Sequence, residues 1–187
     1  MALTSSLVPL GTPAPDFTLP DVAGRPHSLS DFTAPVLVVA FLCNHCPYVK
    51  HIEQALGRIK ATDQVAIVAI SSNDIERYPD DAPPQLADQA NRAGWAFPYL
   101  VDTDQTVAKT YGAVCTPDFF VYGPDRALAY RGAFDPSTPG NGEPVTGADL
   151  TNAIALVAAG QSVPEPHRAS MGCGIKWLPD IDQRGVR

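Results

Sequence analysis

The chain has 187 residues, which is enough for one hydrophobic core but too few for two ordinary domains. Hydrophobic residues make up 45% of it, as in a globular protein, and its longest apolar run, residues 35–43, is far shorter than the roughly 20 residues of a membrane-spanning helix. The formal net charge of -7 and a pI near 4.9 leave no broad basic surface for phosphate backbones, so we expect neither a nucleic-acid partner nor a membrane partner.

The N-terminal part of the chain is predicted to be an extension of the main domain. Residues 13–32 show short apolar alternations around a turn at 21–24, which predicts a small β-hairpin, and residues 1–12 precede it as a separate segment. Residues 1–19 carry no Lys or Arg and are interrupted by three prolines. They do not resemble a secretory signal, so we expect a cytoplasmic protein.

Two apolar runs are predicted to be central strands of a sheet. Residues 36–42 are apolar at every position, as expected of a strand that helices cover on both faces, and residues 65–70 repeat this pattern. Between them, apolar residues at helical spacing follow Pro47, which the first turn of a helix tolerates. The next predicted elements are a helix over about 84–93, a strand over 97–101, a short helix over 105–111, a strand over 118–122, its hairpin return over 127–132, and a helix over 148–159.

This order of elements predicts one α/β domain over residues 13–160, with a central mixed β-sheet flanked by helices. After it, residues 161–187 show no periodicity and are predicted to be an irregular C-terminal tail.

Cys43 and Cys46 stand where a predicted strand meets a predicted helix. Two intervening residues allow the sulfurs to form a disulfide, and a helix N-terminus offers free N–H donors and a positive dipole end. In such motifs the thiol pKa falls from about 8.5 to roughly 3.5–7.5. We therefore expect Cys43 to be ionised and to attack disulfides, and Cys46 to resolve the resulting mixed disulfide.

Three neighbours complete the predicted site: Asn44 and His45 lie between the cysteines, and Pro47 follows them. His45 can stabilise the Cys43 thiolate as a hydrogen-bond donor or as a cation. Static disulfides are rare in a reducing compartment, so the four cysteines of the chain indicate chemistry or metal binding rather than a disulfide scaffold.

A strand, then Cys-x-x-Cys opening a helix, then Thr116-Pro117 leading into another strand, resembles the thioredoxin superfamily. In that family the proline is cis and lies against the active-site disulfide, and the backbone before it pairs with the substrate chain. The resemblance therefore implies that Thr116 and Pro117 belong to the site. The phrase at 13–19, Pro-Ala-Pro-Asp-Phe-Thr-Leu, resembles the redoxin branch, the alkyl hydroperoxide reductase/thiol-specific antioxidant (AhpC/TSA) group, and the whole resemblance covers about residues 13–160.

The chain departs from its relatives at two positions. Many thioredoxins carry a buried acid six residues before the first cysteine, where this chain has Leu37. Peroxiredoxins place a threonine three residues before their reactive cysteine, where this chain has Ala40 before Cys43, and Cys43 itself before Cys46. The peroxidase motif is therefore missing, and the proton acceptor is unassigned among four nearby residues: Lys50, His51, Glu53 and Asp118.

Cys115 and Cys173 are two further thiols. Cys115 directly precedes Thr116, which would put it near the site, and the tail carrying Cys173 could fold back. Cys173 could then meet Cys115, or exchange with the Cys43–Cys46 disulfide as a relay. The alternative is that Cys115 is a small buried apolar residue and Cys173 a surface thiol.

A metal site is the competing interpretation of Cys43 and Cys46. Zinc usually needs a second ligand pair at finger-like spacing, and the sequence has no second Cys-x-x-Cys, while His45 and His51 alone make a poor set of ligands. We therefore expect no metal and no cofactor.

The preferred function is that of a thiol-disulfide oxidoreductase which cycles Cys43 and Cys46 between dithiol and disulfide. Its partners would be a protein or small-molecule disulfide and a cellular thiol reductant. The alternatives are a thiol-dependent peroxidase that uses Cys43, with Cys46 or Cys173 as its resolving thiol, and a non-catalytic module that senses redox state or binds metal. The sequence leaves the oligomeric state and the direction of electron flow open.

Overall fold

The computed structural model describes residues 2–5 and 8–179 of the chain. Five strands form the central sheet: β4 (Val36–Phe41), β5 (Val65–Ser71), β6 (Tyr99–Val101), β8 (Asp118–Tyr122) and β9 (Leu128–Gly132). Their order is β6-β5-β4-β8-β9. The β4–β5 and β5–β6 pairs are parallel, whereas β8 runs antiparallel to both β4 and β9. The sheet is therefore mixed, as the sequence predicted.

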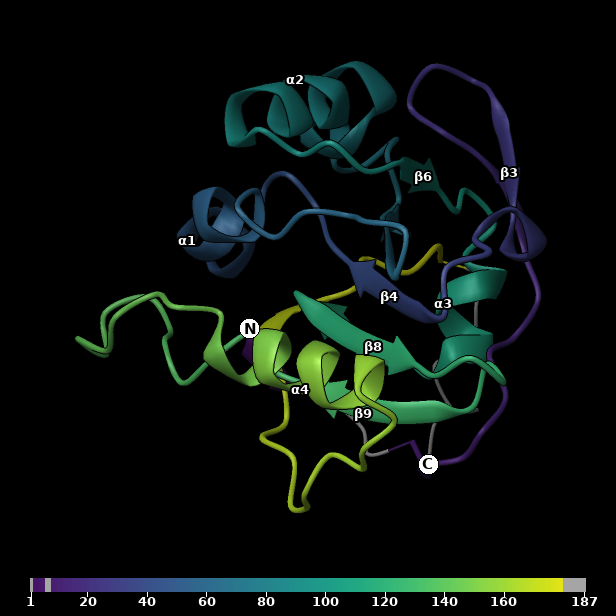
Figure 1. Ribbon diagram of the computed structural model, residues 1–187. Helices are drawn as coiled ribbons and strands as arrows, with labels where there is room; N and C mark the ends of the chain where they lie inside the picture. The colour runs from purple at the N-terminus through teal and green to yellow at the C-terminus, as the bar shows by residue number, and fades with distance from the viewer. Residues whose placement is uncertain (1, 6–7, 180–187) are drawn as a thin grey trace.

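Helices cover the sheet on both faces (Figure 1). They are α1 (Pro47–Leu56), α2 (Pro83–Ala93), α3 (Thr106–Tyr111) and α4 (Ala148–Ala158). Successive side chains of a strand point to opposite faces, so Val38 of β4 packs with α1, α2 and α4, while Leu37 and Val39 pack with α3. This explains why β4 is apolar at every position and why it lies at the centre of the sheet.

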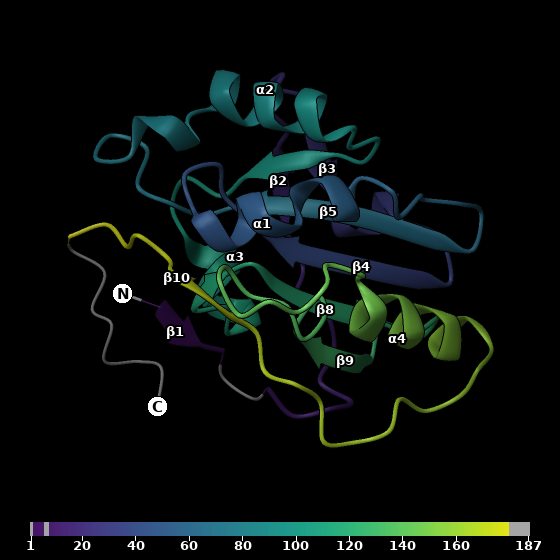
Figure 2. The same cartoon turned by 90° about the vertical axis from the view of Figure 1, so that its left-hand side faces the viewer.

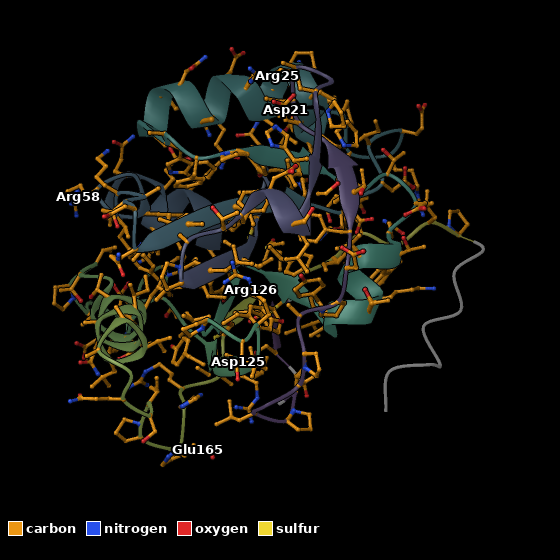
Figure 3. All side chains as sticks on the ribbon, turned by 45° about the vertical axis from the view of Figure 1, so that its right-hand side comes forward. Asp21, Arg25, Arg58, Asp125, Arg126 and Glu165 are labelled. Atoms are coloured by element: carbon orange, nitrogen blue, oxygen red, sulfur yellow. The ribbon has the colours of Figure 1, made fainter. Side chains whose placement is uncertain are left out.

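The predicted N-terminal hairpin is confirmed. It consists of β2 (Thr18–Pro20) and β3 (Pro26–Ser28), which pair antiparallel and are followed by a short 3-10 helix, η1 (Leu29–Asp31). At the turn, the Asp21 carboxylate accepts hydrogen bonds from the backbone N–H groups of Ala23 and Arg25 and pairs with the Arg25 guanidinium at 2.9 Å. Figure 3 shows these two charged side chains next to each other on the hairpin.

A second, smaller sheet joins distant parts of the chain. Its strands are β1 (Ala2–Thr4), β7 (Cys115–Thr116) and β10 (Met171–Gly174). β10 lies in the middle and runs antiparallel to both neighbours. Figure 2 shows β10, in yellow, beside β1. The segment 161–187, predicted to be irregular, thus contributes one strand, because its partners are remote in sequence and leave no local pattern; residues 180–187 lie outside the described part.

The predicted division of the chain at 12/13 and 160/161 stays a prediction, and the β1–β10 pair connects the two outer segments. Among residues 2–5 and 8–179, no helix is long and apolar enough to cross a membrane.

Candidate active site

Cys43 and Cys46 lie at the carboxyl end of β4, where the chain turns into α1. Cys46 is the N-cap of α1 and Pro47 lies in its first turn, as the sequence predicted. Both sulfurs contact one residue of β7: Sγ of Cys43 is 3.1 Å from Oγ1 of Thr116, and Sγ of Cys46 is 3.2 Å from the Thr116 backbone oxygen. The Thr116–Pro117 peptide bond is cis, as the resemblance implied. The structure thus brings the predicted cysteines and the predicted Thr-Pro pair together.

Asp81 holds the loop between the cysteines. It lies at the end of a 3-10 helix, η2 (Pro79–Asp81), and is fully buried. Its Oδ1 accepts the backbone N–H groups of Asn44 at 2.7 Å and His45 at 3.1 Å, and its Oδ2 accepts the Nδ2 group of Asn73 at 2.7 Å and lies 2.6 Å from Nδ1 of His45. Burial raises the pKa of Asp81, but the hydrogen bonds from His45 and Asn73 outweigh it and lower that pKa. An ionised Asp81 can only accept, so Nδ1 of His45 carries a proton in this contact.

Side chains from α2 fix the same loop from a second direction. Nε2 of the buried Gln89 donates to the backbone oxygen of Cys43 at 3.2 Å. Nη2 of Arg92 donates to Oδ1 of Asn44 at 2.6 Å and pairs with Glu53 of α1 at 3.0 Å. Asn44 therefore connects two helices to the cysteine loop, which supports its predicted place beside the pair.

The segment that follows β10 is linked to the cysteine loop through Tyr78 and Asn73. The imidazole of His45 stacks on the ring of Tyr78, with ring centroids 5.3 Å apart, and Nζ of Lys176 lies 5.5 Å from the Tyr78 centroid. The backbone N–H of Lys176 also donates to Oδ1 of Asn73, whose Nδ2 group is bound to Asp81. The C-terminal segment and the cysteine loop thus share one hydrogen-bond network.

Neither sulfur of the pair is exposed: the relative accessibility of Cys43 and of Cys46 is 0%. One cover is β10, where Cys173 lies directly opposite Thr116. At Gly172 the strands approach so closely that an added Cβ would lie 1.9 Å from the Thr116 backbone oxygen, so no side chain fits there. The backbone before the cis proline, expected to pair with a substrate chain, is therefore occupied by a strand of the same chain.

The pKa values of Cys43 and Cys46 are shifted in opposite directions in this buried arrangement. A hydrogen bond from Cys43 lowers the pKa of Cys46 to about 5 against the effect of burial, with further hydrogen bonds from the Cys173 thiol and the Val49 N–H in the first turn of α1. Burial raises the pKa of Cys43 well above its usual value, and donation to Cys46 and the charge of Asp81 act in the same direction. The lower pKa is therefore that of Cys46, whereas the sequence predicted the lower pKa for Cys43.

Cys43, His45 and Asp81 offer ligand atoms that all lie within 4.8 Å of one another, which makes them the metal-binding candidate among residues 2–5 and 8–179. Asp81 fits this role poorly. A carboxylate offers about four lone-pair positions, and Asp81 already uses them for Asn44, His45 twice and Asn73. A metal would have to displace the bonds that hold the loop.

Cys115 lies on β7 opposite Gly174 and is fully buried, and this burial raises its pKa. Because side chains alternate along a strand, Cys115 faces the side opposite to Thr116. Cys173 lies on the same face as Thr116, since directly opposed residues of an antiparallel pair share a face.

The candidate proton acceptors are dispersed. Glu53 pairs with Arg92, His51 contacts the Ser137 hydroxyl at 3.1 Å, and Lys50 is exposed on α1. Asp118 follows the cis proline directly and is almost fully buried, and burial raises its pKa to about 7. Neither of its carboxylate oxygens meets a hydrogen-bond donor at normal geometry within the described part of the chain.

Sequence reasoning missed Asp81, Gln89 and Arg92. Each reaches the cysteine loop from more than thirty positions along the chain, so no spacing motif connects them to it. The pair of acids at 80–81, next to prolines in an otherwise polar loop, was the one visible signal near them.

Comparison with known proteins places the chain in a family. Residues 10–131 match the AhpC/TSA family. The crystal structure of a hypothetical protein from Sinorhizobium meliloti 1021 is 45% identical in sequence, covers 94% of this chain and 98% of its own, and superposes with a TM-score of 0.91.

Two further relatives carry functional descriptions. The thiol-disulfide oxidoreductase ResA of Geobacillus thermodenitrificans (strain NG80-2) is 27% identical over 121 residues, or 61% of this chain, and the chain spans 63% of that relative's length. A secreted disulfide oxidoreductase of Mycobacterium tuberculosis, homologous to E. coli DsbE, is 18% identical, covers 74% of this chain and 94% of its own, and has a TM-score of 0.59. This second likeness confirms the predicted thioredoxin-like fold.

Proposed function

The chain belongs to the AhpC/TSA family, and from this premise we propose that it is a thiol-disulfide oxidoreductase that cycles Cys43 and Cys46 between dithiol and disulfide. The contact of both sulfurs with Thr116, next to the cis proline, carries the proposal. One residue aligns the two sulfurs at the start of a helix, which is the arrangement that disulfide exchange needs. The ResA relative, a thiol-disulfide oxidoreductase, supports the same chemistry.

The reduced pair starts with one proton between two sulfurs. When the cover moves, Cys46 loses the hydrogen bond from Cys173, and transfer of the shared proton from Cys43 to Cys46 makes Cys43 the thiolate. Cys43 then attacks one sulfur of a substrate disulfide, forms a mixed disulfide and expels a thiolate. That thiolate takes the proton from Cys46.

The second step closes the cycle. The Cys46 thiolate attacks Cys43 in the mixed disulfide, the Cys43–Cys46 disulfide forms, and the other half of the substrate leaves as a thiolate. A disulfide and a dithiol monoanion thereby give a disulfide, one thiol and one thiolate. This balance needs no separate carboxylate, which agrees with Leu37 at the position of the missing acid.

The neighbours have positioning roles in this scheme. Asp81 and Arg92 hold Asn44, and Asp81 orients His45. The partners would be a protein or small-molecule disulfide on one side and a cellular thiol on the other, and the Cys43–Cys46 reduction potential decides the direction of flow. A cytoplasmic location stays a prediction, which fractionation of cells that express the tagged chain would test.

The decisive assay is reduction of insulin disulfides with dithiothreitol as electron source, followed for the wild type, Cys43→Ser, Cys46→Ser and Cys115→Ser. We expect turnover in the wild type, its loss in the first two variants, and its retention in Cys115→Ser, whose thiol faces away from the pair. Wild-type turnover that persists in Cys43→Ser, or no turnover at all, would overturn the proposal.

Hydrogen peroxide in place of insulin tests the peroxidase alternative, which family membership keeps open. Rapid peroxide consumption that disappears in Cys43→Ser would favour that alternative. Stoichiometric zinc in protein purified without chelator, together with no insulin reduction, would instead favour the metal-binding module built on Cys43, His45 and Asp81.

A further inference from the structure

The C-terminal strand brings a third thiol to the cysteine pair. We propose that Cys173 is a redox-active partner of Cys46, and that it takes Cys46 out of the Cys43–Cys46 disulfide to form a Cys46–Cys173 disulfide. This inference rests on the proposed function, because the exchange starts from the disulfide which that function generates.

The register of the small sheet carries the proposal. Cys173 lies directly opposite Thr116, so both side chains point to the same face of the sheet. That face holds the cysteine pair: the Thr116 hydroxyl contacts Sγ of Cys43, and the Thr116 backbone oxygen contacts Sγ of Cys46. The half-buried Cys173 packs against the apolar cluster that contains both cysteines.

The strand that carries Cys173 is fastened at several points. β10 pairs with β7 on one edge and with β1 on the other, and Gly172 allows the close approach to Thr116. Beyond the strand, Ile175 donates its backbone N–H to Val114, and Lys176 donates its own to Asn73. These contacts hold the Cys173 thiol beside Cys46 and do not leave it on a free tail.

The pKa shifts of Cys46 and Cys173 are consistent with their proximity. Hydrogen bonding by the side chain and the backbone of Cys173 contributes to lowering the pKa of Cys46. Burial and the donation to Cys46 raise the pKa of Cys173 to about 12, so Cys173 is a thiol while the pair is reduced. Once Cys46 is in a disulfide, it no longer holds that proton in place.

The exchange is balanced without an added oxidant. The Cys173 sulfur attacks Cys46, the Cys46–Cys173 bond forms, the Cys43–Cys46 bond breaks, and the proton of Cys173 passes to the Cys43 thiolate that leaves. The number of disulfides is unchanged. In the product, the disulfide joins Cys46 to Cys173 of β10, and Cys43 is again a free thiol.

Cys115 is the internal comparison. It lies one position from Thr116 in β7, opposite Gly174, and therefore faces the other side of the small sheet. A Cys115–Cys173 disulfide would have to pass through the sheet, so the geometry selects Cys46 as the partner of Cys173.

Trypsin separates Cys115 and Cys173 from the cysteine pair, and Cys43→Ser, described below, identifies which cysteine of the pair is linked. It does not cut the Arg25-Pro26 bond, so Cys43 and Cys46 stay in one peptide, 1–50, whereas Cys115 falls in 110–126 and Cys173 in 169–176. The reduced full-length protein is treated with oxidised glutathione, its remaining thiols are alkylated, and the digest is read by mass spectrometry. We expect peptide 1–50 linked to 169–176 in the wild type and in Cys115→Ser, and complete loss of this link in Cys173→Ser.

Cys43→Ser is the sharper variant, since it removes the competing disulfide. Here Cys46 takes a glutathionyl group from oxidised glutathione, and Cys173 displaces it, so the same link should become the main product. Recovery of Cys173 as the alkylated thiol in both wild type and Cys43→Ser, or its linkage to 110–126, would overturn the inference. Insulin reduction is scored separately: its absence with the link present would reject the proposed function alone, and its presence without the link would reject this inference alone.

Discussion

At the scale of single residues, the site is organised around one carboxylate, that of Asp81, which no sequence motif predicts. Asp81 uses both oxygens for the loop between the cysteines and for Asn73, and it is fully buried. A group with four partners and no solvent tolerates little change, because each partner left without an acceptor keeps its full cost of desolvation. The loop geometry, and with it the reactivity of the pair, therefore depends on a residue outside the Cys-x-x-Cys sequence.

Replacement of Asp81 by Asn tests this dependence. The amide presents N–H groups where N–H donors of Asn44 or His45 already point, so we expect a loss of about 3 kcal/mol in the free energy of unfolding and slower insulin reduction. Urea unfolding and the insulin assay measure the two effects. Asp80→Asn, at the exposed neighbouring position, is the matched control and should behave as the wild type. Equal stability of the two variants would contradict the role given to Asp81.

The raised pKa of Asp118 predicts that the free energy of unfolding depends on pH. Burial raises its pKa to about 7 from an ordinary value of 3.8, so between these values the folded state holds a proton that the unfolded state has lost. The contribution of Asp118 to stability is thus full below pH 3.8 and is lost as the pH rises to about 7. Asp118→Asn should remove this loss and stabilise the protein at pH 8 by up to about 4 kcal/mol, since one pKa unit corresponds to about 1.4 kcal/mol.

Urea titrations of the wild type and Asp118→Asn at several pH values test this dependence. If the free energies of unfolding of the two proteins change with pH in parallel, ionisation of Asp118 does not destabilise the folded state, and the prediction is wrong. Because the proposed exchange balances its proton between the two cysteines, the variant should also keep its insulin reduction.

At the scale of secondary structure, the short strand β10 decides whether the cysteine pair can be reached. It closes over the pair only because Gly172 has no side chain, which lets it lie against the Thr116 backbone oxygen. Substitution of this glycine should therefore act on access and not on the central sheet, from which β10 is separate.

Gly172→Ala should push β10 away from β7, because the added Cβ would lie 1.9 Å from a backbone oxygen. We expect Cys43 and Cys46 to react faster with a coloured aromatic disulfide. If the substitution destabilises the closed position of β10 by about 1.4 kcal/mol or more, the rate should rise by a factor of ten or more. In Gly174→Ala, the matched control, the closest atom to the new Cβ is the movable end of the Leu3 side chain at 2.8 Å, and the nearest backbone atom, the Val114 oxygen, is at an ordinary contact distance of 3.9 Å. Equal rates in both variants would mean that another segment controls access.

The same scale shows what could be predicted from the sequence. The strands of the central sheet and all four helices have local signatures, such as the apolar run 36–42 and the helical spacing after Pro47, and they are found where predicted. β1, β7 and β10 are two to four residues long and gain their hydrogen bonds from remote segments, so nothing local marks them. The cysteines and Thr116-Pro117 were found because each is a motif in itself, whereas Asp81 is defined only by what the fold places beside it.

At the scale of the whole molecule, the N-terminal strand supports the site from a distance. β1 pairs with β10, and β10 pairs with β7 beside the cysteines, so Ala2–Thr4 helps to hold the cover from the edge of β10 opposite to β7. The central sheet pairs through separate ladders, so it should persist without β1.

Deletion of residues 1–5 tests this support. It should increase the reaction rate of the cysteine pair with the same aromatic disulfide and leave the far-ultraviolet circular dichroism spectrum unchanged. A spectrum that collapses would show that the small sheet is needed for folding, and an unchanged rate would show that β7 alone retains β10.

The position of β10 in the chain also affects how the protein is made. The ribosome synthesises the segment with Cys43 and Cys46, and then β5, β8 and β9, before it synthesises Met171–Gly174. The nascent chain can thus assemble its central sheet around two uncovered thiols that mature molecules bury. Newly made protein is for that interval the form most exposed to cellular oxidants, and completion of the last strand ends that exposure.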